Sequence, residues 1–103
     1  MIVRSWRALA KSEKEVAYLT HFRDEVLPHL RQLAGFCGVT LLRKDQAHGV
    51  EIIVLTRWAS LSAVRAFAGP DRDAAVVADA AQAWFHSYEK IVTHHEVVLD
   101  DEI

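Results

Sequence analysis

The chain has 103 residues and a mass of 11.6 kDa, enough for one domain over residues 1–103 that exposes about 5,800 Å² of surface when folded. Apolar residues make up 51% of it and charged residues 25%, which excludes a disordered chain. The net charge of −2 lacks the basic excess of nucleic-acid binding proteins, and the lone cysteine, Cys37, excludes an internal disulfide and a zinc ribbon.

The first half of the chain predicts one strand and one long helix. Residues 2–9 are partly β-branched and partly alternating, which is typical of a strand. Residues 13–33 predict an amphipathic helix, because apolar side chains recur at three- and four-residue steps. Pro28 lies inside this helix and cannot donate a hydrogen bond to the carbonyl of Asp24. We therefore expect the helix to kink or end within one turn of Pro28.

The second half predicts three strands and a second helical region. The strands are expected at 36–43, 50–58 and 92–99, with a polar hairpin loop at 44–49. Helices are expected near 60–89, where Ser60 is the predicted cap of a short helix and the Ala-rich stretch 72–89 favours a second one. Gly69 and Pro70 separate the two.

This order of elements predicts an α+β, ferredoxin-like βαββαβ fold, with a four-stranded antiparallel sheet and helices on one face. The strand 50–58 is apolar on both sides, with Ile52 and Val54 on one side and Ile53 and Leu55 on the other. The chain has no element left to cover the second face. We expect a homodimer that packs sheet to sheet; the alternative is a hydrophobic strand in a monomer.

Four segments carry a family resemblance, and they fall in order at plausible spacings. They are Ile-Val-Arg-Ser-Trp-Arg at 2–7, Leu-Thr-Arg-Trp-Ala-Ser at 55–60, Ala-Val-Arg-Ala-Phe-Ala-Gly-Pro-Asp at 63–71 and Val-Thr-His-His-Glu-Val at 92–97. Together they resemble the antibiotic biosynthesis monooxygenase family of dimeric α/β-barrel proteins. The resemblance covers nearly the whole chain and implies a dimeric barrel.

The resemblance also bears on the chemistry. The family includes oxygenases that act on phenols and quinols without a cofactor, and also enzymes that degrade haem. Several of its oxygenases use an Asn beside a Trp. Trp58 matches the family tryptophan, but this sequence contains no Asn. That departure keeps open a second hypothesis, a protein that binds a small molecule or haem without catalysis, and a third, a structural or regulatory dimer.

His94 and Trp58 are the predicted catalytic residues. His94 matches the strand histidine of the family, and imidazole can take a phenolic proton near neutral pH. The alternative is a half-buried histidine that is hydrogen-bonded to a neighbouring strand. His95 points to the opposite face of the sheet, because strand side chains alternate. The two adjacent histidines therefore cannot bind one metal in one pocket, and no metal site is expected.

Six further side chains are predicted to bind the substrate, and they are Arg4, Trp6, Tyr18, His21, Phe67 and Trp84. The aromatic ones would line a slot for a flat molecule, and Arg4 would hold an anionic oxygen. Tyr18 and His21 are neighbours on one helix surface. The alternative for the aromatic residues is core packing, and for Arg4 it is an ion pair across the sheet. For Tyr18 and His21 the alternative is a solvated helix face.

The leading hypothesis is a monooxygenase-like enzyme that acts on an aromatic or quinol-like molecule. Molecular oxygen would be the co-substrate and no cofactor is expected, although haem stays open because a single histidine can ligate it. The charged N-terminus does not resemble a signal peptide, and no stretch approaches a membrane span. We therefore expect a cytoplasmic protein whose partners are a small molecule and a second copy, with no nucleic acid and no membrane.

Overall fold

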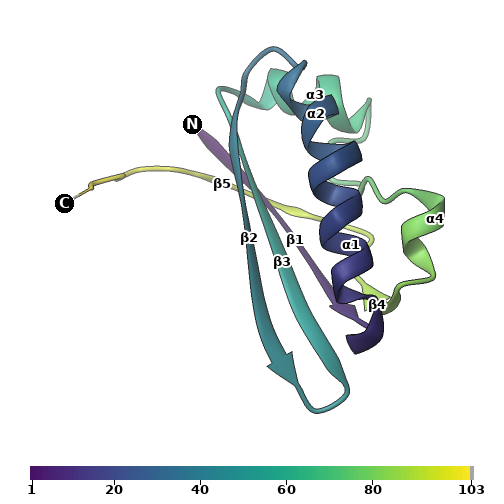
Figure 1. Cartoon of the computed structure of the whole chain (residues 1–103). Coiled ribbons are helices and arrows are strands. Elements are labelled where there is room, and N and C mark those ends of the chain that lie inside the picture. The colour runs from purple at the N-terminus through teal and green to yellow at the C-terminus, as the bar shows by residue number, and fades with distance from the viewer. Residues whose placement is uncertain (103) are drawn as a thin grey trace.

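Five strands form one antiparallel sheet in the computed structural model, which describes residues 1–102 (Figure 1). They are β1 (Ile2–Ala10), β2 (Phe36–Gln46), β3 (Gly49–Trp58), β4 (Phe85–Tyr88) and β5 (Thr93–Glu96). The order is β2-β3-β1, and the free side of β1 pairs with β5 along its first half and with β4 along its second. The α+β, ferredoxin-like prediction is confirmed.

Helical segments lie along one face of this sheet (Figure 1). A 3₁₀ turn η1 (Ser12–Lys14), α1 (Glu15–His21), a π-helical turn η2 (Phe22–Val26) and α2 (Leu27–Arg31) follow one another without a break. Two shorter helices, α3 (Leu61–Ala68) and α4 (Asp79–Gln82), lie later in the chain. Within residues 1–102, no helix has the length and apolar character needed to cross a membrane.

The long helix is distorted next to Pro28, as predicted. The amide of Leu27 donates to the carbonyl of Phe22, five residues back, so the turn before the proline is π-helical. Because Pro28 has no amide hydrogen, the ordinary bond to the carbonyl four residues back cannot form there. The helix ends at Arg31, within one turn of the proline.

The predicted helical region 60–89 is only partly correct. Its first part is α3, where the Ser60 hydroxyl accepts a hydrogen bond from the amide of Ala63 at 3.2 Å, as expected of a cap. Residues 69–78 are not helical, α4 covers only four residues, and Phe85–Tyr88 is strand β4. Alanine favours a helix by less than about 1 kcal/mol per residue, so tertiary hydrogen bonds can override that preference.

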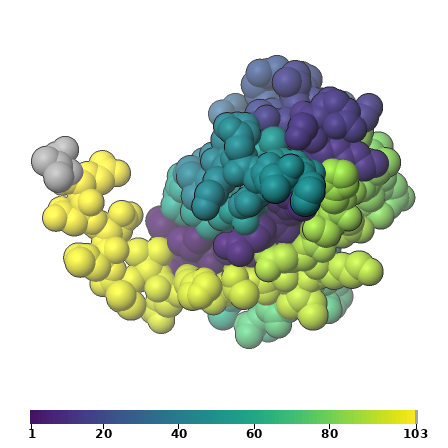
Figure 2. Space-filling model, turned by 90° about the horizontal axis from the view of Figure 1, so that it is seen from below, coloured from purple at the N-terminus to yellow at the C-terminus, as the bar shows by residue number. Residues whose placement is uncertain are grey.

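Two predicted boundaries also differ. The last strand was expected at 92–99, but β5 ends at Glu96, since its partner β1 begins at Ile2 and only the amide of Val97 still reaches the carbonyl of Met1. The chain beyond this point projects from the body (Figures 1 and 2). The hairpin loop was expected at 44–49, but β2 pairs with β3 as far as Gln46, which leaves a two-residue turn.

The two faces of β3 differ in burial, as the alternating pattern predicts. Ile52 and Val54 are buried under the helices, together with Trp6 and Ala8 of β1. The open face carries Glu51, Ile53, Leu55 and Arg57, which are half-exposed. The core therefore occupies only the helix-covered side of the sheet.

The turn from the long helix into β2 requires glycine at position 35. Its φ is +84°, and a Cβ there would lie 2.5 Å from the Cβ of Ala63. Left-handed backbone costs alanine about 1–2 kcal/mol, and overpacking adds a cost of about the same size.

We expect Gly35→Ala to lower the free energy of unfolding by at least about 1 kcal/mol more in the wild-type background than in an Ala63→Gly background, measured by urea denaturation. Equal losses in the two backgrounds would show that the contact with Ala63 relaxes freely.

Candidate functional site

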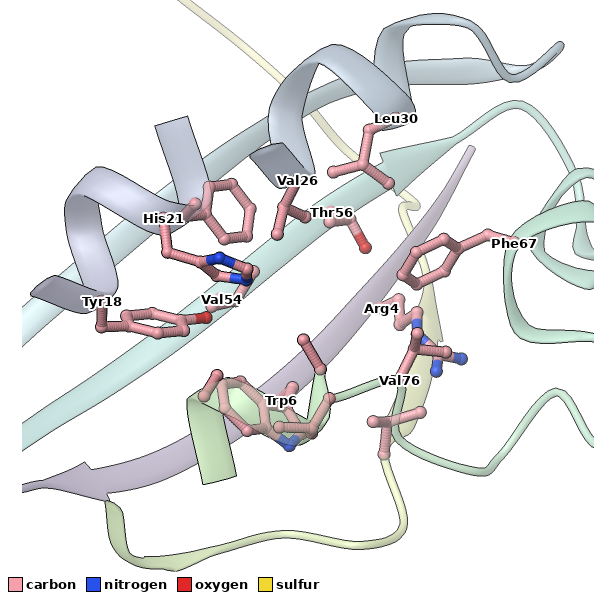
Figure 3. A pocket seen from close by; sticks show the side chains of 15 residues that line it. Arg4, Trp6, Tyr18, His21, Val26, Leu30, Val54, Thr56, Phe67 and Val76 are labelled. Carbon is pink, nitrogen blue, oxygen red and sulfur yellow. The ribbon is translucent and has the colours of Figure 1, made fainter. Parts of the chain in front are cut away.

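A cavity of about 70 Å³ lies between the sheet and the helical layer. Figure 3 shows Tyr18 and His21 of α1 on one side of it, Trp6 of β1 on another, and Arg4 and Phe67 at the far end. Val76, Val77 and Ala78, from the irregular segment 69–78, complete the wall. The cavity is therefore bounded by segments from both halves of the chain.

Aromatic rings form most of the wall on the side of β1 and α1. The Trp6 ring meets that of Phe85 edge to face at 5.5 Å, and its Nε1–H donates to the carbonyl of Glu89 at 2.7 Å, which fixes its orientation. Tyr18 is also buried, and burial raises the pKa of its phenol, so the hydroxyl stays protonated near neutral pH. That hydroxyl is directed into the cavity (Figure 3).

Arg4 brings a positive charge to the far end of the cavity, although it is only 4% exposed. Its Nη1 donates to the carbonyl of Arg72 and, at 3.0 Å, to Nε2 of His94. Its Nη2 donates to the carbonyl of Ala74 at 2.6 Å, and the guanidinium lies 5.6 Å from the ring centre of Phe67. Burial lowers the pKa of Arg4, but a guanidinium keeps its proton inside proteins.

His94 faces the helix-covered side of the sheet, as predicted, but it does not line the cavity among the described residues. Its side chain is 10% exposed, its Nε2 accepts from Arg4, and its Nδ1 lies 3.3 Å from Oδ1 of Asp73. Burial and the charge of Arg4 lower the pKa of His94, while Asp73 partly opposes them. The ring is thus neutral at pH 7, and these partners assign its proton to Nδ1.

The geometry does not place His94 where the predicted base would act. A base that acts on a molecule in the cavity needs a free lone pair within reach of it. Here Arg4 lies between His94 and the cavity and occupies the Nε2 lone pair. The resemblance identified the position of His94 on its strand, but not its neighbour across the sheet.

Trp58 also lies behind the cavity wall and not on it. It is fully buried, stacks on Phe67 at 5.6 Å, and meets Phe36 edge to face at 5.4 Å. Its Nε1–H donates to the Thr56 hydroxyl at 2.9 Å. Trp58 therefore supports Phe67 instead of touching a bound molecule. The structure places Trp84 outside the wall too, edge-on to the ring of His21 at 5.5 Å.

His21 is the histidine that reaches the cavity within residues 1–102. It lies on α1 one turn from Tyr18, and the contact with Trp84 orients its ring. Imidazole is the side chain best suited to exchange a proton near neutral pH. Five of the eight predicted site residues thus surround one cavity, and they are Arg4, Trp6, Tyr18, His21 and Phe67.

The sequence reasoning missed Thr56, the wall residues of segment 69–78, and Asp73 beside His94. The irregular backbone of this segment was not predicted, because its Ala-rich composition favours a helix. The Gly69-Pro70 pair was the one signal that the chain could leave helical structure here.

A model of the family described as antibiotic biosynthesis monooxygenase matches residues 1–89. The chain belongs to this family. Among solved structures it is similar to a protein from Bacillus cereus described as a putative antibiotic biosynthesis monooxygenase, with a TM-score of 0.70, 16% identity, and 99% of this chain and 97% of that one covered. A comparison with curated protein sequences finds no match.

Two similar structures contain ligands. The monooxygenase ActVA-Orf6 of Streptomyces coelicolor, in complex with nanaomycin D, has a TM-score of 0.65 and 14% identity over 97% of this chain and 92% of that one. The haem degrader MhuD of Mycobacterium tuberculosis, with two haems in its active site, has a TM-score of 0.61 and 24% identity over 97% and 99%. At these identities the likeness shows a shared fold.

Haem does not fit the cavity as the structure shows it. An apolar cavity of about 150 Å³ holds one benzene, and a porphyrin is several times larger than benzene. The cavity here has about half that space. His21 could offer a nitrogen to iron, but Trp6, Phe67 and Val76 lie close around the cavity and leave no room for a macrocycle. We therefore derive no step through haem.

The hydrogen bond from Trp58 to Thr56 should contribute to stability, because it satisfies a buried indole N–H. Thr56→Val keeps the shape of the side chain and removes the acceptor. Leaving a buried donor without a partner costs about 1–3 kcal/mol. We expect a loss of that size in urea unfolding.

The matched control is Thr20→Val on the exposed surface of α1, away from the sheet. That variant should change stability by less than about 0.5 kcal/mol. Equal effects of the two substitutions would contradict the role assigned to burial.

Proposed function

We propose that the protein is a monooxygenase that oxidises a phenol or quinol in this cavity, with molecular oxygen as co-substrate and without a cofactor. The observation that carries the proposal is the placement of His21 and the Arg4 guanidinium on the wall of one aromatic, largely enclosed cavity. Membership of the family supports the reaction class. The structure of ActVA-Orf6 with nanaomycin D supports a flat aromatic ligand.

Binding of such a molecule follows from the chemistry of the walls. The rings of Trp6, Tyr18 and Phe67 offer apolar contact to a flat molecule. Arg4 supplies a positive charge at one end, and its Nε–H donates to no protein group within residues 1–102. A phenolate oxygen at that end would be stabilised, because charge interactions strengthen where water is excluded.

The reaction begins with removal of the phenolic proton by the His21 imidazole. The resulting phenolate is electron-rich and can reduce dioxygen directly. The balance closes without an added reductant: a phenol with a free para carbon and one dioxygen give a quinone and one water. One oxygen atom bonds to the para carbon, and the O–H, ring C–H and O–O bonds break, so that two C=O groups result. The departing oxygen leaves as water, with the hydrogen from the ring carbon and the proton that the imidazolium returns. Water that a bound substrate excludes from the cavity cannot react with the intermediate.

The test follows oxygen uptake over a panel of phenols and quinols. General base catalysis contributes about 10² to 10⁴ in rate, so we expect His21→Ala to lower kcat by at least about 100-fold. His29→Ala is the matched control, because His29 lies on the same helical run but is exposed, and it should leave kcat unchanged. No uptake with any compound, or full activity in His21→Ala, would contradict the proposal.

We also propose that two copies pack sheet to sheet. Ile53 and Leu55 are half-exposed on the open face, and Leu42 beside them is 46% exposed. The chain exposes 6,641 Å², whereas a folded monomer of this mass exposes about 5,800 Å². The excess is close to the roughly 800 Å² that each partner buries in a standard interface. Val98 and Leu99 of the projecting tail add further exposed apolar surface.

Light scattering at micromolar concentration should give about twice the mass of 11.6 kDa. Leu55→Glu should shift the mass to that of one chain, because it places a charge in the apolar contact. Val16→Glu is the control, since Val16 is exposed on the opposite, helical side. A dimer that survives Leu55→Glu would place the interface elsewhere.

A further inference from the structure

Three charged or titratable side chains from three separate segments meet beside the cavity. Arg4 comes from β1, His94 from β5 and Asp73 from the irregular residues 69–78, which we name the cover segment. Arg4 donates to Nε2 of His94 at 3.0 Å, and Nδ1 of the same ring lies 3.3 Å from the Asp73 carboxylate. The imidazole thus links the guanidinium to the cover segment.

Arg4 also holds the cover segment directly. Its two terminal nitrogens donate to the carbonyls of Arg72 and Ala74. The same stretch forms two backbone hydrogen bonds with the chain before β5, from the Ala75 amide to the Lys90 carbonyl at 2.9 Å and from the Val92 amide to the Asp73 carbonyl at 2.8 Å. The residues that follow it, 76–78, close the cavity wall.

The cover segment must move for a substrate to enter. The cavity has about half the space of one that holds a benzene ring, and its other walls are the β-sheet, the long helix and single residues of α3 and α4. The cover segment has no helix or strand of its own between residues 69 and 78. Ala75 and Val77 pack against the core, and the polar contacts with β1 and β5 run through Arg4, His94 and residues 90–92. Opening therefore requires that the hold of Arg4 be released.

We propose that His94 is a positioning residue that keeps Arg4 on the cover segment while it is neutral, and that its protonation frees the segment and opens the cavity. The neutral ring accepts the Arg4 hydrogen bond at Nε2. A protonated ring places an N–H and a positive charge against the guanidinium, so the hydrogen bond is lost and repulsion replaces it. The proposal rests on the proposed function only in taking this cavity as the substrate site.

The charges around His94 set the direction of the effect. Arg4 faces it from β1, Asp73 and Arg72 face it from the cover segment, and His95 and Glu96 follow it on β5. Burial and the two arginines lower its pKa, and Asp73 opposes them. The open state binds the proton more readily, so closure is fully favoured above the ordinary pKa of about 6.5 and is lost as the pH falls below it.

Amide hydrogen exchange measured by NMR tests the proposal without any substrate. The amides of Ala75 and Val92 report on docking of the cover segment. Corrected for intrinsic rates, their protection should fall at least about threefold between about pH 7.5 and pH 5.5, while the amides of the β1–β3 pairing stay unchanged. In His94→Gln, whose amide can still accept from Arg4 but cannot titrate, the fall should disappear.

Two further variants complete the test. His95→Gln removes the neighbouring histidine on the opposite sheet face and should keep the wild-type fall. Asp73→Asn keeps an acceptor for Nδ1 but removes the negative charge that favours the protonated ring, so the fall should move to lower pH. A pH dependence that persists in His94→Gln, or protection that does not change with pH in the wild type, would overturn the proposal. Because exchange needs no turnover, either result is independent of whether oxygen uptake is found.

Discussion

A guanidinium enclosed within a small fold is the constraint on which the second half of this structure depends. A buried charge is unfavourable unless its donors are satisfied, so Arg4 requires acceptors from whatever packs over it. Two of them are the carbonyls of Arg72 and Ala74. Within an α-helix those carbonyls would be bonded along the helix axis. The buried charge therefore favours irregular backbone here, despite the alanine content.

Where local pattern and burial agree, the sequence was enough to predict the fold. Alternation in β3 correctly separated Ile52 and Val54 from Ile53 and Leu55, although it did not say which set is buried. The spacing of apolar residues identified the long helix, and Pro28 its distortion. The stretch 72–89 failed because no short-range pattern records a hydrogen bond to a residue some 70 positions away. The short β5 pairs only with the first half of β1. The second half of β1 offers its free backbone groups to Phe85–Tyr88, which pairs with it as β4.

Most site residues predicted from local pattern line the cavity, and the two predicted from the family resemblance do not. Alternation on β1 places Arg4 and Trp6 on one face of the sheet, and the helical period places Tyr18 and His21 on one side of α1. The cavity lies between these two surfaces. His94 and Trp58 were chosen by resemblance to the family. A resemblance gives the position of a residue on its strand but not its distance from the cavity. Each is one layer behind the wall, His94 behind Arg4 and the indole behind Phe67.

The π-helical turn has a consequence for the shape of the binding surface. Tyr18, Phe22, Val26 and Leu30, four residues apart in succession, all line the cavity. In a regular α-helix each four-residue step advances by about 40° beyond a full revolution, so the last side chain would have rotated by about a third of a circle. The wider turn takes more residues per revolution and cancels part of that drift. The proline therefore straightens an apolar stripe that an ideal helix would have wound away from the cavity.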